Sequence, residues 1–273
     1  MKNCLFLILL FITSCASNTI EESQAKKAEL HYGHGTASLI RGDYTTALEQ
    51  LLLAIQIDPE NSQYNNNLGM AYYFKNEKAL AGSYIRKAIE LDKKNTDAKM
   101  NLASIYMDEG KLEQAEQLYQ EVLKDLIYPH HYRTYYNLGA LAFKKNDFKK
   151  AEEFFKKSLE IKSEYCPSHF QLGLLMDKKQ EFRKAGEHLK QSYQGTCTNN
   201  PAPHYFYALN SIKLKKYDDA RIKLNEIMKR FSSTEYDTKA RLKLSELDTI
   251  IEQDQFRTEK AQLNSKKHFA PDF

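Results

Sequence analysis

Cysteine and histidine are the side chains of this 273-residue sequence best suited to catalysis or metal binding, and there are four and eight of them. None belongs to a recognisable catalytic pattern, since the sequence has no HExxH motif, no phosphate-binding loop and no serine in a nucleophile elbow. His130 and His131 are adjacent, and adjacent helical residues do not share a face. We therefore expect no metal site, no cofactor and no small-molecule substrate. An enzyme is the alternative that these residues support least.

The N-terminus carries the pattern of a processing signal. Lys2 provides a positive charge, and residues 4–12 form an apolar run, too short for a membrane-spanning helix, which takes about 20 apolar residues. The run leads into Ile12–Cys15, an aliphatic residue and two small ones before a cysteine. This pattern resembles the lipobox of bacterial lipoproteins. The resemblance implies that residues 1–14 are a signal peptide and that Cys15 is acylated; a plain secretory signal with an incidental cysteine is the alternative.

Acylation at Cys15 predicts where the chain resides. Residue 16 is alanine and not the aspartate that retains many such lipoproteins at the inner membrane, so we expect the periplasmic face of the outer membrane. One acyl chain binds a membrane only marginally, whereas the three chains of a lipoprotein, palmitate among them, form a permanent anchor. Residues 15–27 are then the lipidated cysteine and a tether.

Two thiols remain after processing, Cys166 and Cys197, in a compartment that permits disulfides. A bridge across this separation of 31 residues would stabilise the fold by about 3–4 kcal/mol in the loop-entropy model. Two free buried thiols or half of a metal site are the alternatives, although the nearest histidines, His169 and His204, lack finger-like spacing. We predict the disulfide.

A small residue recurs along the mature chain with a nearly constant period. It stands at Ala47, Ala81, Ala115, Ala151, Ala185 and Ala220, at intervals of 34, 34, 36, 34 and 35 residues. Another small residue lies twelve positions before each of them, at Gly35, Gly69, Ala103, Gly139, Gly173 and Ala208. Such a period indicates structural units that bury their apolar faces only against their neighbours.

The period and its small residues resemble the tetratricopeptide repeat, a pair of antiparallel helices. The resemblance implies an all-α, right-handed superhelical solenoid of about six repeats, at 28–61, 62–95, 96–129, 132–165, 166–199 and 201–234. His31 and His34 replace large apolar residues of the repeat, which predicts an atypical first unit; a metal site formed by the two is the alternative. Apolar residues at helical spacing within 235–262 predict a capping helix over the last apolar face, and 263–273 are expected to be a flexible tail.

The first helix of each repeat is expected to line a concave, partner-binding groove. Its groove-facing positions are Tyr32, Met70, Tyr73, Phe74, Met100, Met107, Tyr136 and Phe143. Methionine and tyrosine suit the capture of an amphipathic helix, while the alternative is that some of them pack against neighbouring helices. Asn67, Asn101 and Asn137 recur at the sixth position of three successive repeats, where the repeat family often uses asparagine to hydrogen-bond a peptide backbone.

The composition argues against other classes of partner. Glycine and proline together are 16 of 273 residues, about half the usual share, which favours helices. The net charge is only +4, and no long basic run occurs, whereas nucleic-acid binders concentrate basic residues on one face. We therefore expect a protein partner and no nucleic acid.

Three features together narrow the resemblance: the lipobox, the six repeats, and an insertion containing Tyr128–Pro129 between the third and fourth repeats. They resemble the PilF/PilW family of type IV pilus biogenesis lipoproteins. The resemblance implies a pilotin, whose lipid directs it to the outer membrane and whose repeats bind the secretin subunit, so that secretin assembles there into the ring through which the pilus emerges. The alternative is another periplasmic lipoprotein adaptor, for peptidoglycan or outer-membrane protein assembly; both are binding modules, and composition does not separate them.

Overall fold

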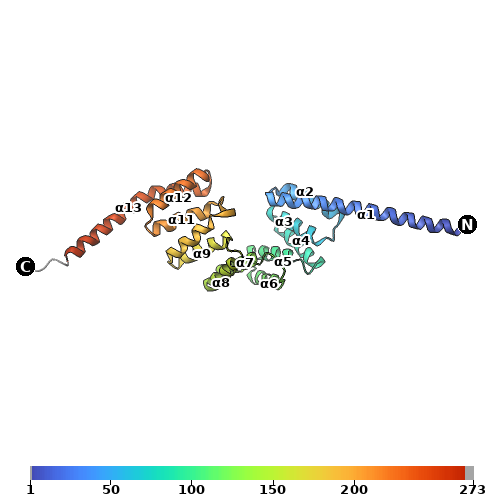
Figure 1. The fold of residues 1–273 in the computed structure, drawn as a ribbon, viewed down its shortest axis with the longest axis horizontal. Coiled ribbons are helices and arrows are strands. Elements are labelled where there is room, and N and C mark those ends of the chain that lie inside the picture. The colour runs from blue at the N-terminus through green and yellow to red at the C-terminus, as the bar shows by residue number, and fades with distance from the viewer. Residues whose placement is uncertain (1, 268–273) are drawn as a thin grey trace, which may run out of the picture. The chain divides into compact units, whose positions relative to one another are not determined.

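The computed structural model describes residues 2–267, with the side-chain environment of residues 22–260. Every regular element in this range is helical and no strand occurs within it, so the predicted all-α class is confirmed. The elements in Figure 1 are α1 (Lys2–Arg41), α2 (Tyr44–Ile57), α3 (Ser62–Phe74), α4 (Lys78–Leu91), α5 (Thr96–Asp108), α6 (Leu112–Val122), α7 (His131–Lys144), α8 (Phe148–Ile161), α9 (Cys166–Lys178), α10 (Phe182–Ser192), the short 3₁₀ helix η1 (Gly195–Cys197), α11 (Pro201–Lys213), α12 (Tyr217–Arg230) and α13 (Glu235–Lys267).

The chain divides into two compact units, residues 1–137 and 138–273, with the boundary inside α7. The N-terminal unit contains α1 to α6 and the start of α7, and the C-terminal unit contains the rest. Within each unit, helices that follow one another in the chain pack together, as α3 does with α4 and α9 with α10. α1 begins at Lys2, well before the expected start of the first repeat at residue 28, and α7 begins at His131, one residue before the expected start of the fourth. The other helix pairs lie within the expected ranges.

The periodic alanines form the centre of every helix pair. All six of them, Ala47, Ala81, Ala115, Ala151, Ala185 and Ala220, are 0% exposed. The small residue on the first helix allows an equally close approach: a Cβ added to Gly69 on α3 would lie 2.5 Å from Cγ1 of Ile85 and 3.0 Å from the carbonyl oxygen of Ala81 on α4. Only a residue without a side chain fits at that crossing, which is the physical reason for the repeated glycine.

The turn between the two helices of each pair contains one residue in the left-handed region. The six residues are Gly42, Asn76, Gly110, Asn146, Gln180 and Lys215, with φ angles of 80°, 65°, 76°, 61°, 63° and 59°. This conformation closes the C-terminus of the first helix, and glycine or asparagine adopts it at little cost. Gln180 and Lys215 adopt it against their steric preference, so the turn is imposed by the packing of the helices and not by these residues.

The terminal helices extend beyond the repeats. α13 packs against α12 and α11 through Ala240 and Leu247, both 0% exposed, and continues to Lys267, past the expected end of the cap at residue 262. α1 contains residues 2–14 of the expected signal peptide and the expected tether within one continuous helix. The side chain of Cys15 and residues 268–273 of the expected tail lie outside the described residues. Among the described residues, no helix combines the length and the apolar character needed to cross a membrane.

Candidate protein-binding surface

Asn67 on α3, the first of the three predicted groove asparagines, links two repeats. Its side-chain amide donates to the Tyr32 hydroxyl at 3.2 Å and to Oγ1 of Thr36 at 2.9 Å, both on α1. Tyr32 in turn stacks on Tyr64 with ring centroids 4.7 Å apart, and burial raises the pKa of the Tyr32 hydroxyl. Both N–H groups of the Asn67 amide are therefore used within the fold.

Asn66, a residue that the sequence pattern does not mark, connects this link to the next repeat. Its amide donates to Oδ1 of Asn67 at 3.1 Å, and its own Oδ1 accepts from the Asn101 amide at 3.0 Å. Farther along, the Asn137 amide lies 3.5 Å from Oγ of Ser104 and makes a long contact of 3.6 Å with the Met100 sulfur. We call Asn66, Asn67, Asn101 and Asn137 the amide ladder; it joins successive first helices of the N-terminal unit.

Tyr73 and Phe74, at the end of α3, differ in accessibility. The Tyr73 hydroxyl donates to a carboxylate oxygen of Asp108, and this hydrogen bond, together with burial, raises the pKa of Tyr73 to about 12. Phe74 stacks on Tyr44 with ring centroids 4.7 Å apart and meets the edge of Tyr73 at 5.4 Å. Phe74 is 45% exposed, and it is the one exposed residue among the eleven predicted groove residues.

The remaining predicted groove residues are at least partly buried. Met100 is 7% exposed, and Met70 packs against a buried cluster that includes Ile85. Phe143 lies in the C-terminal unit, where its ring meets Phe148 edge-on at 5.3 Å. The structure thus brings three pairs of predicted groove residues into contact: Tyr32 with Asn67, Tyr73 with Phe74, and Met100 with Asn137. Met107 and Tyr136 are partly buried. Phe143 belongs to the C-terminal unit, apart from the others.

The insertion at residues 125–129 presents two apolar side chains to solvent. Leu126 is 88% exposed and Ile127 is 90% exposed. Tyr128 fixes the loop, because its hydroxyl donates to Oδ1 of Asp97 at 2.8 Å. The sequence shows two adjacent aliphatic residues here, but adjacency alone does not predict that their side chains are exposed to solvent.

Histidine pairs occur where the sequence did not predict them. Nδ1 of His31 donates to Oε1 of Gln50 at 2.8 Å. In the fifth helix pair, Nδ1 of His169 and Nδ1 of His188 are 3.0 Å apart, and Nε2 of His169 donates to the Ser163 carbonyl at 2.9 Å. Within residues 22–260, no three histidine, cysteine, aspartate or glutamate side chains gather as metal ligands would.

A disulfide and a polar network stabilise the C-terminal unit. Cys166 at the start of α9 is bonded to Cys197 in η1, so the bridge closes a separation of 31 residues around the α9–α10 pair. Cys166 is 3% exposed. The bridge thereby fixes the loop that leads from α10 into α11.

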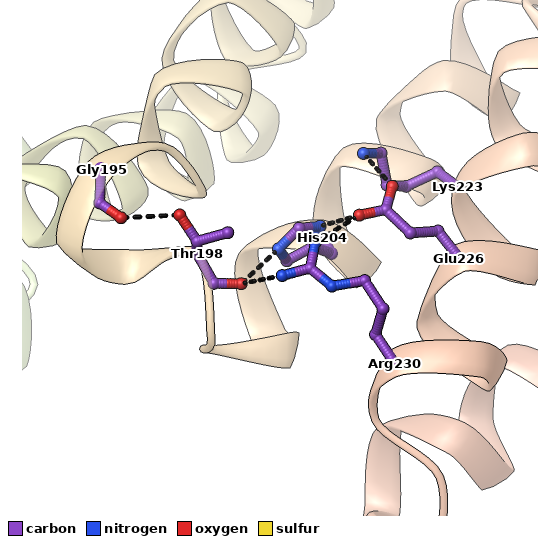
Figure 2. A network of polar contacts seen from close by, with 6 residues as sticks. All are labelled: Gly195, Thr198, His204, Lys223, Glu226 and Arg230. Carbon is purple, nitrogen blue, oxygen red and sulfur yellow. Dashed lines mark hydrogen bonds and ion pairs between the residues drawn. The ribbon is translucent and has the colours of Figure 1, made fainter.

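Thr198, the residue after Cys197, is hydrogen-bonded to α11 and to α12, as Figure 2 shows. The Thr198 carbonyl accepts from Nε2 of His204 at 3.0 Å and from the Arg230 guanidinium at 3.2 Å. Glu226 accepts from Lys223 and from Arg230, each at 2.6 Å, and lies 3.7 Å from Nδ1 of His204. His204 is 1% exposed, and burial lowers its pKa below the ordinary value of 6.5.

Comparison with protein families identifies the repeat. Tetratricopeptide-repeat models match residues 96–164 and 62–95, and a TPR repeat model matches residues 35–76. The type IV pilus assembly protein PilF of Pseudomonas aeruginosa is 27% identical over 164 residues, which are 57% of this chain and 64% of PilF. The regulatory protein RapD of Bacillus subtilis is 31% identical over 123 residues, 41% of this chain and 35% of RapD. The chain thus spans less than two thirds of the length of the curated relatives it matches.

Solved structures agree on the fold. The structure of Pseudomonas aeruginosa PilF superposes with a TM-score of 0.67 at 20% identity, covering 81% of this chain and 99% of that one. The crystal structure of PilW, described as a widely conserved type IV pilus biogenesis factor, gives a TM-score of 0.66 at 16% identity, covering 77% and 96%. The predicted tetratricopeptide-repeat solenoid and the predicted resemblance to PilF and PilW are confirmed.

Proposed function

We propose that this tetratricopeptide-repeat chain is a non-catalytic scaffold of type IV pilus biogenesis that acts as a pilotin. In this function Cys15 carries the lipid that holds the chain on the periplasmic face of the outer membrane. The repeats bind the secretin subunit and deliver it to that membrane for ring assembly. The observation that carries the proposal is the relationship to PilF across 164 residues, combined with the lipobox-like sequence ending at Cys15.

The helical repeats support a binding function because stacked helix pairs provide an extended surface for contact with another protein. Tetratricopeptide repeats are generally protein-interaction modules, and first helices that run side by side form an extended face for an amphipathic helix. Phe74 at the end of α3 offers an exposed apolar ring, which stacks on Tyr44 and meets the edge of Tyr73. The amide ladder joins the first helices of the same unit by hydrogen bonds.

The anchor is tested by replacing one cysteine at a time. The Cys15→Ala variant should lose fatty-acid labelling and remain in the soluble periplasmic fraction, and the yield of secretin rings in the outer membrane should fall. Cys4→Ala is the matched control, because Cys4 lies in the expected signal peptide and leaves with it. Unchanged labelling in the Cys15→Ala variant would exclude the anchor, and an unchanged ring yield would exclude the pilotin mechanism.

Partner binding is tested by capture of secretin from detergent-solubilised membranes. The wild-type chain should retain secretin, and Phe74→Ala should retain about tenfold less if this ring fills an apolar pocket of the partner. Leu80→Ala is the matched control, because Leu80 is 44% exposed but lies on α4, a second helix. Capture of peptidoglycan enzymes or outer-membrane assembly proteins in place of secretin would replace the pilotin with the adaptor function.

A further inference from the structure

A hollow between α10 and α11 in the C-terminal unit belongs to none of the surfaces described above. Its walls carry three cationic side chains, Arg183, Lys190 and Lys216, and one carboxylate, Glu187, among the described residues. The formal charge of this lining is therefore 3 − 1 = +2. Tyr207 and Leu214 add aromatic and aliphatic surface beside the charges. A concave site with converging charges of one sign attracts ligands of the opposite sign.

Gly186, in the lining of the hollow, lets α10 approach α11 closely. A Cβ at Gly186 would lie 2.7 Å from Oδ1 of Asn210 on the facing helix, closer than real Cβ contacts. Asn210 is 1% exposed, and its amide donates to the Phe182 carbonyl at 3.0 Å. Its Oδ1 accepts no hydrogen bond from any residue that the structure describes. The close approach of the two helices therefore depends on glycine at position 186.

The three cations differ from their neighbours in having no acidic partner. Lys184 pairs with Glu181 at 2.6 Å, Lys213 with Asp177 at 2.6 Å, and Lys215 with Asp254 at 2.5 Å. Among the described residues, no ion pair joins Arg183, Lys190 or Lys216 to a carboxylate, although Glu187 lies one helical turn from two of them. Charges of one sign that share a hollow repel one another, and an incoming oxyanion relieves this repulsion.

We infer that this hollow binds an acidic peptide segment of a protein partner. Side-chain carboxylates of the segment pair with Arg183, Lys190 and Lys216, and its apolar groups lie against Tyr207 and Leu214. A peptide carries both kinds of group, whereas a free phosphate has no apolar surface. The inference rests on the proposed function in one respect, that the chain is a protein-binding scaffold, and it adds a second contact surface to that of Phe74.

Anisotropy of a fluorescein-labelled hexaglutamate peptide tests the charge requirement, with the full chain purified in detergent. We expect saturable binding at low salt, loss of binding at high salt, and no binding of hexaglutamine or hexalysine. Arg183→Gln with Lys190→Gln should weaken hexaglutamate binding by about tenfold or more, the loss that one charge-assisted hydrogen bond carries. Lys149→Gln with Lys229→Gln removes the same charge from exposed lysines of the same unit and should leave binding unchanged.

A steric test is independent of charge. Gly186→Ala places a methyl group against Asn210 and should abolish peptide binding, although alanine favours the helix by about 1 kcal/mol over glycine. Gly82→Ala is the matched control, because Gly82 has the same place in its repeat, and there a Cβ would approach only the flexible guanidinium of Arg86, at 3.1 Å. The control should bind like the wild type.

The outcomes separate this inference from the proposed function. Equal loss in both charge variants, or unchanged binding in Gly186→Ala, would overturn the inference even if secretin capture succeeds. Binding of inorganic phosphate to the hollow without binding of hexaglutamate would make it an oxyanion site and would also overturn it. Binding of the peptide in the hollow, without any capture of secretin, would support the inference and contradict the pilotin.

Discussion

The N-terminal and C-terminal units are built from the same helix pair, but their polar side chains are used differently. In the N-terminal unit, the side-chain amides of Asn67 and Asn101 donate hydrogen bonds to neighbouring first helices. In the C-terminal unit, a disulfide and the Thr198–His204–Arg230 contacts connect the helices. No carboxylate of a described residue forms an ion pair with the three cations in the α10–α11 hollow. The side chains that the sequence marks as ligand-binding are therefore largely committed to the fold, while less conspicuous ones are left available.

The two units also differ in the residue at the left-handed position of the turn within each helix pair. The left-handed residue of the N-terminal unit is Gly42, Asn76 or Gly110, and each of these suits the conformation. In the C-terminal unit, two of the three corresponding residues are Gln180 and Lys215, which do not. The packing of the helix pair therefore determines the turn, and the residue in it only adjusts the stability.

The largest expected effect comes from removing the disulfide. Replacing Cys166 and Cys197 with alanine should lower the free energy of unfolding of the C-terminal unit by about 3–4 kcal/mol, because the bridge closes a separation of 31 residues in the unfolded chain. Hydrogen exchange followed by mass spectrometry should show faster exchange in α9 and α10, with α3 and α4 unchanged. Equal acceleration in α3 would show that the two units do not lose stability separately.

The second effect concerns the amide ladder. Asn67→Ala should lower the free energy of unfolding of the N-terminal unit by about 1–2 kcal/mol, because Tyr32 and Thr36 each lose a hydrogen-bond donor. Asn137→Ala is the matched control, since its contacts of 3.5 and 3.6 Å are long and should be worth less. Urea denaturation measures both. If Asn67→Ala is neutral, the ladder is no structural device and Asn67 returns to the set of ligand-binding candidates.

The third effect is a gain of stability. Gln180→Gly should raise the free energy of unfolding of the C-terminal unit by about 0.5–1 kcal/mol, because glycine adopts φ of 63° without a Cβ clash. The reverse change, Gly110→Gln, should lower the stability of the N-terminal unit by a similar amount. Thermal unfolding of both variants measures the difference. A loss of stability in Gln180→Gly would mean that the Gln180 side chain stabilises the fold by more than its left-handed backbone conformation destabilises it.

The repeat was predictable from the sequence because its geometry demands small residues at fixed intervals. A close helix crossing, as at Gly69 against Ile85, leaves room for only a small residue. The six repeats accordingly carry glycine or alanine at this position. The same is true of the buried alanines. The pairing of Cys166 with Cys197 was predictable because the lipobox resemblance assigns Cys4 to a signal peptide and Cys15 to acylation, which leaves two cysteines.

The candidate surfaces were less predictable because they depend on partners far away in the sequence. Asn67 finds Tyr32 and Thr36 at separations of 35 and 31 residues, and nothing in the local pattern marks Thr36 or Asn66 as part of a ladder. The close approach of α10 to α11 depends on Gly186 facing Asn210 across two helices. Side-chain burial along a helix face, such as that of Met100, is decided by the neighbouring helix and not by the residue type.

The smallest expected effect is a dependence of the C-terminal unit on pH. Burial lowers the pKa of His188 and of His204 below the ordinary value of 6.5. His169 and Lys156 lower the pKa of His188 further, and Glu187 and Glu152 oppose them. The unfolded chain binds protons at these histidines at a higher pH than the folded chain does. The stability they contribute is therefore complete above pH 6.5 and declines as the pH falls through that value toward the lowered pKa values.

Hydrogen exchange in α9 to α12 at pH 7.5, 6.5 and 5.5, corrected for the intrinsic exchange rate, measures this decline before carboxylates begin to titrate. His188→Gln should reduce the decline while keeping the fold, because it recreates in the fifth helix pair the histidine–glutamine contact that His31 makes with Gln50 at 2.8 Å in the first. The decline that remains belongs to His204 and should disappear in the double variant with His204→Gln. A decline of the same size in the single variant would mean that the pH dependence of this unit comes from His204, with its contacts to Thr198 and Glu226, and not from His188.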